Sequence, residues 1–162
     1  MVKTKIIYLD SCIFISYFMK ETEKIKKIDN FFQESKKSNI EFITSDWTLT
    51  EIVKVLIKDK NISSKKVAEY IQELKRTKRL NEIKFNWIPV SKREKYDFEE
   101  FFYELQKVQL QYKGSLGDVL HAVIMKNNSI NIILTTDSEF YGMKGMIIIN
   151  PLNLNEKTGV LK

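Results

Sequence analysis

Four acidic residues occupy positions that a parallel α/β protein brings together. Asp10 and Asp137 come directly after apolar, strand-like runs, and Glu51 and Asp118 fall in the first turns of predicted apolar helices. In a parallel α/β sheet, the carboxyl ends of the strands and the starts of the following helices lie on the same rim. We therefore expect these four carboxylates to converge at one edge of the sheet.

Converging carboxylates repel one another and disfavour their own ionised forms, and a hard divalent cation relieves that repulsion. Carboxylate oxygens suit Mg²⁺ or Mn²⁺, which keep positions open for water and phosphate oxygens. One cysteine and one histidine are too few ligands for a structural zinc site. In a chain of net charge +6, such a site suits phosphodiester hydrolysis, in which the metal lowers the pKa of the attacking water.

Each acid also has a purely structural interpretation. Asp10 and Asp137 could cap a helix or a turn. Asp118 could form a capping box with Ser115, three residues before it. Glu51 could be an acid favoured in a first turn by the helix dipole. Each of these interpretations explains one residue, whereas a shared metal site explains the positions of all four.

Two further residues near the acids are expected to pack rather than react. His121 follows Asp118 by three residues, but its helix is so apolar that a packed histidine is favoured over a ligand. Cys12, the lone cysteine, is expected to pack as a small hydrophobe. A lone cysteine allows no intramolecular disulfide, which favours a reducing compartment.

Strands and helices alternate along the chain that must position these acids. The continuous apolar run from Lys5, broken at Asp10, predicts a central strand buried on both faces, followed by a helix with Ser11 as its N-cap. Strands are predicted at 5–10, 40–44, 82–90, 130–136 and 145–151, and helices at 12–18, 21–38, 45–58, 63–80, 92–112 and 115–127. This pattern predicts an α/β fold, a three-layer α/β/α sandwich with a mostly parallel sheet of four to five strands.

The 162 residues show no boundary, so we expect a single domain over residues 1–162, with residues 58–92 as a basic helical insertion or lid. Residues 58–79 hold eight basic and three acidic side chains. A basic patch of this kind can contact nucleic acid, although it can also be a solvated helix face. The candidate RNA-binding residues in it are Lys75, Arg76, Lys78 and Arg79.

No apolar stretch approaches the roughly 20 residues that a membrane helix needs. The apolar run near the N-terminus is broken at Asp10, and no small-residue cleavage site follows it. We therefore expect a cytoplasmic protein without a membrane partner.

Four motifs in order carry a resemblance to a known family: YLDSCIF, TSDWTLTEIVKVL, SLGDVLHAVIM and ILTTDSEF. They resemble the PIN-domain ribonucleases, a family that includes VapC-like toxins and related archaeal and bacterial proteins, over residues 5–151. The resemblance implies a Mg²⁺- or Mn²⁺-dependent endonuclease acting on single-stranded or structured RNA. It also implies that Asp10, Glu51, Asp118 and Asp137 are its metal-binding and catalytic residues.

The resemblance implies further roles and partners. Thr136 would support Asp137 from behind the metal ligands, and Ser11 and Thr50 would neighbour the site. The chain would be the toxin of a toxin–antitoxin pair, with a small antitoxin protein as partner and a homodimer as its assembly.

Several alternatives stay open at this point. The long basic segment 58–92 leaves room for an RNA-processing or ribosome-associated nuclease. A PIN-like RNA-binding or scaffold module without catalysis is a further alternative. Haloacid-dehalogenase-like phosphatases also place an Asp after the first strand, but they need a second Asp two residues on, where this chain has Cys12.

Overall fold

Five strands paired in parallel form the central sheet, in the order β5-β2-β1-β6-β7. The structure is a computed structural model and describes residues 4–88, 90, 98–112 and 114–153. The strands of the sheet are β1 (Lys5–Leu9), β2 (Ile40–Ser45), β5 (Asn86–Ile88), β6 (Ile132–Leu134) and β7 (Ile147–Ile149). The predicted parallel sheet is confirmed, with β1 at its centre.

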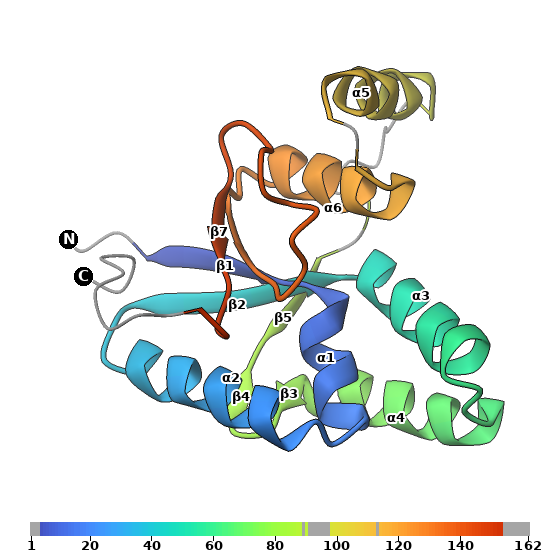
Figure 1. Ribbon diagram of the computed structural model, residues 1–162. Coiled ribbons are helices and arrows are strands. Elements are labelled where there is room, and N and C mark those ends of the chain that lie inside the picture. The colour runs from blue at the N-terminus through green and yellow to red at the C-terminus, as the bar shows by residue number, and fades with distance from the viewer. Residues whose placement is uncertain (1–3, 89, 91–97, 113, 154–162) are drawn as a thin grey trace.

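Helices cover both faces of this sheet (Figure 1). One face carries α1 (Ser11–Phe18), α2 (Thr22–Ser35) and α4 (Ser64–Thr77), and the other carries α6 (Leu116–Asn127), with α5 (Phe98–Gln111) packed against α6. Helix α3 (Asp46–Lys54) follows β2 and continues into a π-helical turn, η1 (Val55–Asp59). The predicted α/β/α sandwich is therefore confirmed. Within the described residues, no helix has the length and apolar character needed to cross a membrane.

Strand β1 is buried on both faces, as its continuous apolar sequence predicts. Ile7 and Leu9 point into the hydrophobic cluster beneath α1, α2 and α4, whereas Tyr8 between them points into the cluster beneath α6. All three side chains have 0% exposure. Packing from both sides fixes the end of β1, and Asp10 follows there directly.

The described part of segment 58–92 packs into the body of the protein. Val67 and Leu74 of α4 are buried in the same cluster as Ile7. Strand β5 pairs with β2 at the edge of the sheet. The segment thus supplies core side chains and a strand to the fold.

Residues 82–90, predicted as one strand, form two short pieces, and this prediction was wrong in its bounds. Strand β4 (Ile83–Lys84) pairs antiparallel with β3 (Arg79–Leu80), and β5 follows after Phe85. The reason lies in two residues with left-handed backbone, Lys78 (φ 50°) and Asn81 (φ 54°). Lys78 ends α4 earlier than predicted, and Asn81 turns the chain back into the hairpin.

Other predicted bounds shift by a few residues. The last two predicted strands shorten to β6 and β7, and the helix after β1 begins at Ser11. The predicted start of the helix at residues 92–97, and Pro89, lie outside the described residues.

Candidate active site

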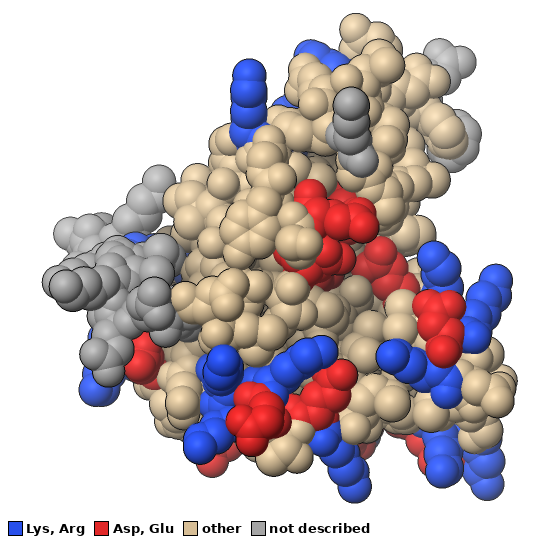
Figure 2. Space-filling model, viewed as in Figure 1, with Lys and Arg blue, Asp and Glu red and all other residues tan. Residues whose placement is uncertain are grey.

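All four predicted acids line one cleft of about 350 Å³ at the carboxyl ends of the strands. Figure 2 shows acidic side chains gathered near the middle of this face, with Lys and Arg side chains farther out along its lower part. The acidic residues that line the cleft are Asp10, Glu21, Glu51, Asp118, Asp137 and Glu139. The structure thus brings the four predicted acids to one rim, together with two that were not predicted.

Asp10 is held at the end of β1 by donors from three residues, Ser11, Cys12 and Thr135. Its Oδ1 accepts the backbone N–H of Ser11 at 2.6 Å, and its Oδ2 accepts the hydroxyl of Thr135 at 2.6 Å and the thiol of Cys12 at 3.1 Å. Asp10 is also the N-cap of α1, so the prediction of Ser11 as N-cap was wrong. The reason is that the backbone is still extended at Asp10 (ψ 158°), and the helix begins one residue earlier than expected. Asp10 therefore caps a helix and faces the cleft at the same time.

Thr135 links two of the acids. It is fully buried, donates to Asp10 and accepts the backbone N–H of Asp137 at 2.9 Å. Thr136, the predicted supporting residue, lines the cleft, and its backbone N–H donates to the sulfur of Cys12 at 3.2 Å. The carboxylate of Asp137 lines the cleft and also accepts the N–H of Glu139, which closes the predicted turn.

Cys12 is a hydrogen-bond donor at the floor of the site, beyond its predicted role as a small hydrophobe. Burial and the charge of Asp10 raise the pKa of its thiol, and hydrogen bonds from the threonines 135 and 136 only partly oppose this. The thiol therefore stays protonated at neutral pH and can donate to the carboxylate. Since the thiolate is the reactive form, Cys12 is not suited to act as a nucleophile.

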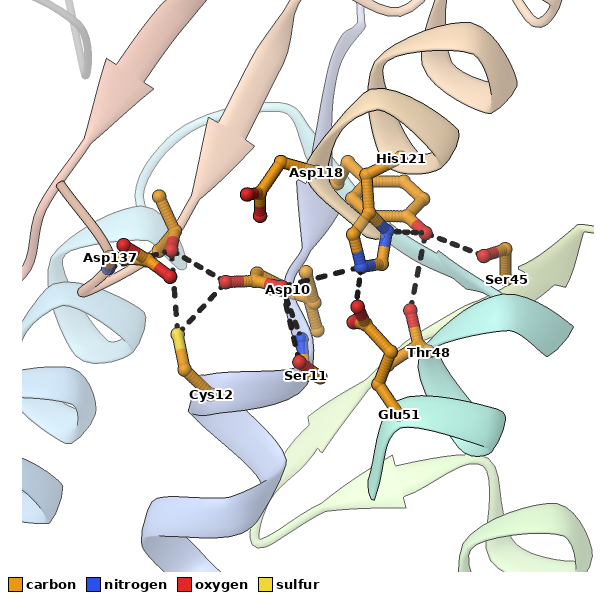
Figure 3. A network of polar contacts seen from close by, with 12 residues as sticks. Asp10, Ser11, Cys12, Ser45, Thr48, Glu51, Asp118, His121 and Asp137 are labelled. Carbon is orange, nitrogen blue, oxygen red and sulfur yellow. Dashed lines mark hydrogen bonds and ion pairs between the residues drawn. The ribbon is translucent and has the colours of Figure 1, made fainter. Parts of the chain in front are cut away.

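His121 lies between two of the acids (Figure 3). Its Nε2 is 2.5 Å from Oε2 of Glu51 and 3.6 Å from Oδ1 of Asp10. One ligand atom from each of Asp10, Glu51 and His121 lies within 4.8 Å of the other two. The histidine is fully buried, as predicted for a packed residue, yet its ring nitrogen faces the acids.

The other nitrogen of His121 is fixed from behind. Nδ1 is 2.8 Å from the hydroxyl of Tyr8, which in turn lies 2.5 Å from Oγ of Ser45 and 3.1 Å from Oγ1 of Thr48. All of these side chains are buried. The ring of His121 is therefore held in one orientation by a hydrogen-bonded network that runs through β1, β2, α3 and α6.

The charges of the site favour a protonated His121 when no metal is bound. Burial lowers the pKa of His121, but the oxygen of Tyr8, the hydrogen bond to Glu51 and the charges of Asp10 and Glu51 together raise it to about 10. For Glu51, burial raises the pKa, but the hydrogen bond and charge of His121 outweigh it and lower the pKa. A protonated imidazole thus balances the two carboxylates in the metal-free protein.

Asp118 lies in the first turn of α6, three residues before His121, and lines the same cleft (Figure 3). It forms the predicted capping box, in which its backbone N–H donates to Ser115 Oγ at 3.3 Å and its carboxylate accepts the backbone N–H of Ser115. The hydroxyl of Ser115 also donates to Asp118 Oδ2 at 2.6 Å. The backbone N–H of Ser115 approaches both Asp118 Oδ2 (3.1 Å) and Glu139 Oε2 (3.4 Å), so the two carboxylates lie close together. Burial raises the pKa of Asp118, the hydroxyl of Ser115 opposes this, and the neighbouring Glu139 adds to the rise.

The predicted neighbours and basic residues are placed differently from the acids. Ser11 lines the cleft, whereas Thr50 is exposed and contacts the carbonyl of Asp46 in its own helix. None of the four predicted RNA-binding residues is among those that line the cleft. All four are exposed, and Arg76 pairs with Glu73. The basic residues that do line it are Lys24, Lys54 and Lys60.

Some of the residues that the sequence prediction missed carried a signal. Glu139 follows Asp137 by two residues in the same turn, and Thr135 precedes it by two, so both could have been grouped with it. Tyr8 carried none, because an aromatic residue in a buried strand is expected to be core. Its partner His121 is 113 positions away, and only the folded sheet brings the two together.

The residues present fit a divalent cation. Carboxylates and one imidazole converge from separate elements, and neighbouring negative charge contributes to the raised pKa values of both Asp118 and His121. Carboxylate oxygens suit Mg²⁺ and Mn²⁺, and an imidazole nitrogen is better accepted by Mn²⁺. Asp10, Glu51, Asp118 and Asp137, which line the same cleft, are the residues that would hold such an ion.

A comparison with protein families gives one match. The family model for the PIN domain matches residues 7–145, which include all four of the predicted acids. No curated protein matches the chain.

Solved structures give further matches. VapBC2 from Rickettsia felis, bound to a promoter DNA fragment, matches with a TM-score of 0.60 and 15% identity over 90% of this chain and 98% of that one. VapC20 of Mycobacterium tuberculosis, a sarcin–ricin loop cleaving toxin, matches with a TM-score of 0.59 and 11% identity, over 83% of this chain and 92% of that one. A toxin–antitoxin complex from Klebsiella pneumoniae matches with a TM-score of 0.55 and 17% identity, over 90% of this chain and 97% of that one. At these identities, the matches show a shared fold.

Proposed function

This chain belongs to the PIN domain family, and on that premise we propose that it is an endoribonuclease that depends on Mg²⁺ or Mn²⁺. One observation carries the proposal: Asp10, Glu51 and His121 offer ligand atoms within 4.8 Å of one another, in a cleft that Asp118 and Asp137 also line. Without a cation, repulsion between these carboxylates disfavours their ionised forms, and a bound cation relieves that repulsion. The reaction is hydrolysis of a phosphodiester bond.

The roles of the residues follow from their surroundings. Asp10 and Glu51 hold the metal, because both are fixed by neighbours on packed elements. When bound, the ion supplies a lowered pKa for the attacking water and stabilises charge on the phosphate and the leaving oxygen. Asp118 lines the same cleft and, in this proposal, holds the ion together with Asp137 and orients the attacking water.

The first experiment is RNA cleavage with and without metal. We expect the purified protein to cleave labelled single-stranded RNA in Mg²⁺ or Mn²⁺, and to lose this activity when EDTA removes the metal and regain it when metal is added back. Activity that persists in EDTA would contradict the proposed metal dependence. Absence of cleavage on varied single-stranded and structured RNAs would favour the alternative, a PIN-like RNA-binding or scaffold module without catalysis.

We also propose that this ribonuclease is the toxin of a toxin–antitoxin pair. Two solved proteins that share its fold are described as a toxin–antitoxin complex and as a toxin that cleaves the sarcin–ricin loop. The chain spans 92–99% of the length of the similar structures, so it matches them as a whole. A small antitoxin protein would then be its partner, and RNA its substrate.

The basic residues at the cleft lead to a prediction about RNA binding. Lys54 and Lys60 are exposed at the cleft that the acids line, where flanking phosphates of a bound strand would pass. Replacing both with Gln should weaken RNA binding and flatten the dependence of log K on log salt by about 0.7 for each phosphate that the protein no longer neutralises. Fluorescence anisotropy of labelled RNA at several salt concentrations measures both effects.

A matched control variant removes two positive charges at a site away from the cleft. Replacing Lys75 and Lys78 with Gln tests the basic residues at the end of α4, which we propose as an outer contact for longer RNA. With a short RNA, we expect this variant to bind like wild type while the variant at Lys54 and Lys60 binds more weakly. Equal weakening in both variants would mean that only net charge matters.

A further inference from the structure

Helix α6 brings two residues against the carboxylate of Glu51. Gly117 and His121 are four positions apart and therefore lie on the same face of the helix. Oε2 of Glu51 contacts Nε2 of His121 at 2.5 Å. Oε1 lies where a larger residue at position 117 would be, because a Cβ atom on Gly117 would come within 2.6 Å of it. Both oxygens of Glu51 are thus placed by α6.

The backbone of Gly117 does not explain why a glycine stands there. Among the described glycines, left-handed backbone occurs at Gly142 and Gly145, not at Gly117. Gly117 lies in the first turn of α6, where glycine is less favourable than alanine because it loses more chain entropy. What the glycine does provide is room for the close approach of Glu51.

His121, which contacts the other oxygen of Glu51, is held in place and cannot shift together with the carboxylate. His121 is fully buried, and its Nδ1 is fixed by the hydroxyl of Tyr8, which Ser45 and Thr48 hold in turn. A methyl group at position 117 would therefore displace the carboxylate of Glu51, the flexible end of a side chain with 19% exposure. The displacement would push the carboxylate of Glu51 away from α6 and therefore away from His121.

We propose that Gly117 is a positioning residue, which keeps space beside α6 so that Glu51 reaches its place in the metal site. This inference rests on the proposed function for its consequence in catalysis. The placement of Glu51 by Gly117 is a property of the metal-free protein as well, so the two can be tested separately.

The test compares Gly117→Ala with Gly114→Ala. Gly114 lies three residues earlier, and a Cβ atom there would meet only ordinary contacts, the nearest being the Met143 methyl at 3.5 Å. Three measurements are made on each protein: Mn²⁺ affinity by isothermal titration calorimetry, thermal stability without metal, and the NMR signals of the histidine ring. The chain has one histidine, so these signals need no further assignment.

For Gly117→Ala, we expect Mn²⁺ affinity to fall by about 10- to 100-fold, the usual cost of disturbing the support of a metal ligand. Without metal, loss of the contact between Glu51 and His121 should lower thermal stability, and the better helix propensity of alanine should offset part of that loss. The ring signals of His121 should shift in the metal-free protein, since Glu51 moves away from the ring. Gly114→Ala should leave the Mn²⁺ affinity and the ring signals as in wild type.

Two results would overturn the inference. One is a Gly117→Ala protein with the Mn²⁺ affinity and ring signals of wild type. The other is an equal fall in affinity in both variants together with lower stability, which would indicate a general disturbance of α6. If wild type binds no Mn²⁺ but the ring signals of Gly117→Ala still shift, the proposed function fails while the placement of Glu51 stands.

Discussion

Asp10→Asn is expected to lower metal-dependent RNA cleavage by at least about 10²-fold, the size of effect seen when one positioned catalytic group is removed, and to leave the fold intact. The amide keeps the shape of the side chain and one oxygen that can accept from Ser11 or Thr135. It removes the negative charge that attracts the metal. Cleavage assays and the growth of a bacterial host that produces each protein measure the loss of activity. Circular dichroism measures whether the fold is intact.

The growth measurement also tests the toxin role. We expect production of the wild type to arrest growth and production of Asp10→Asn to allow it. Asp29→Asn is a suitable control, because this acid lies in α2 and contacts Tyr17 and Asn81 away from the cleft. If Asp10→Asn cleaves RNA like wild type, Asp10 does not hold the metal and the assigned site is wrong.

Asp10 and Asp118 show why the sequence predicts acids at one cleft and why their structural interpretations also hold. Asp10 caps α1 and faces the cleft, and Asp118 completes a capping box and faces the same cleft. Helix starts after parallel strands need caps and also lie at the rim where sites form. The same fold rule therefore generates both interpretations, and an acid at such a position can serve both purposes.

His121 shows where prediction from the sequence fails. Its burial was predicted correctly, since the helix around it is apolar on nearly all sides. Its orientation was not, because that depends on Tyr8, Ser45 and Glu51, which come from three other elements. Periodicity reports which face of a helix is buried, but not which polar atoms on other elements meet it there.

The basic residues show a second limit. The densest run of Lys and Arg in the sequence ends α4 and begins β3, and one of its arginines is paired with Glu73 on its own helix. The bases that reach the cleft are separated in sequence from that run: Lys24 lies in α2, and Lys54 and Lys60 flank the π-helical turn η1. Charge density along the chain identifies a basic protein. Which lysines lie at the cleft depends on the fold, because Lys54 ends α3 and Lys60 follows its π-helical turn.

The second large effect concerns the stability of the metal-free protein as pH rises. The pKa of His121 is raised from 6.5 to about 10 in the folded state. A raised histidine pKa gives stability that is fully present below the unfolded value and is lost as pH rises through the folded value. Because each pKa unit corresponds to about 1.4 kcal/mol, we expect a loss on the order of 3 kcal/mol between pH 6.5 and 9.

Urea unfolding at several pH values with EDTA present measures this loss. The window ends at pH 9 because above it the buried Cys12, Tyr17 and Tyr70 add their own losses, their pKa values being raised by burial. His121→Gln should lose the slope within the window. A wild type whose stability is flat from pH 6.5 to 9 would contradict a protonated His121.

The same physics predicts how metal acts. In the metal-free protein, the proton on His121 is the positive charge that lies between Asp10 and Glu51, 3.6 Å and 2.5 Å from their oxygens. A divalent cation held by the same carboxylates supplies that charge instead, so metal and proton compete. Added Mg²⁺ should therefore stabilise the protein more at pH 9 than at pH 6.5, since stabilisation by a ligand grows as its apparent affinity grows. Equal stabilisation at both pH values would mean that the ion binds apart from His121.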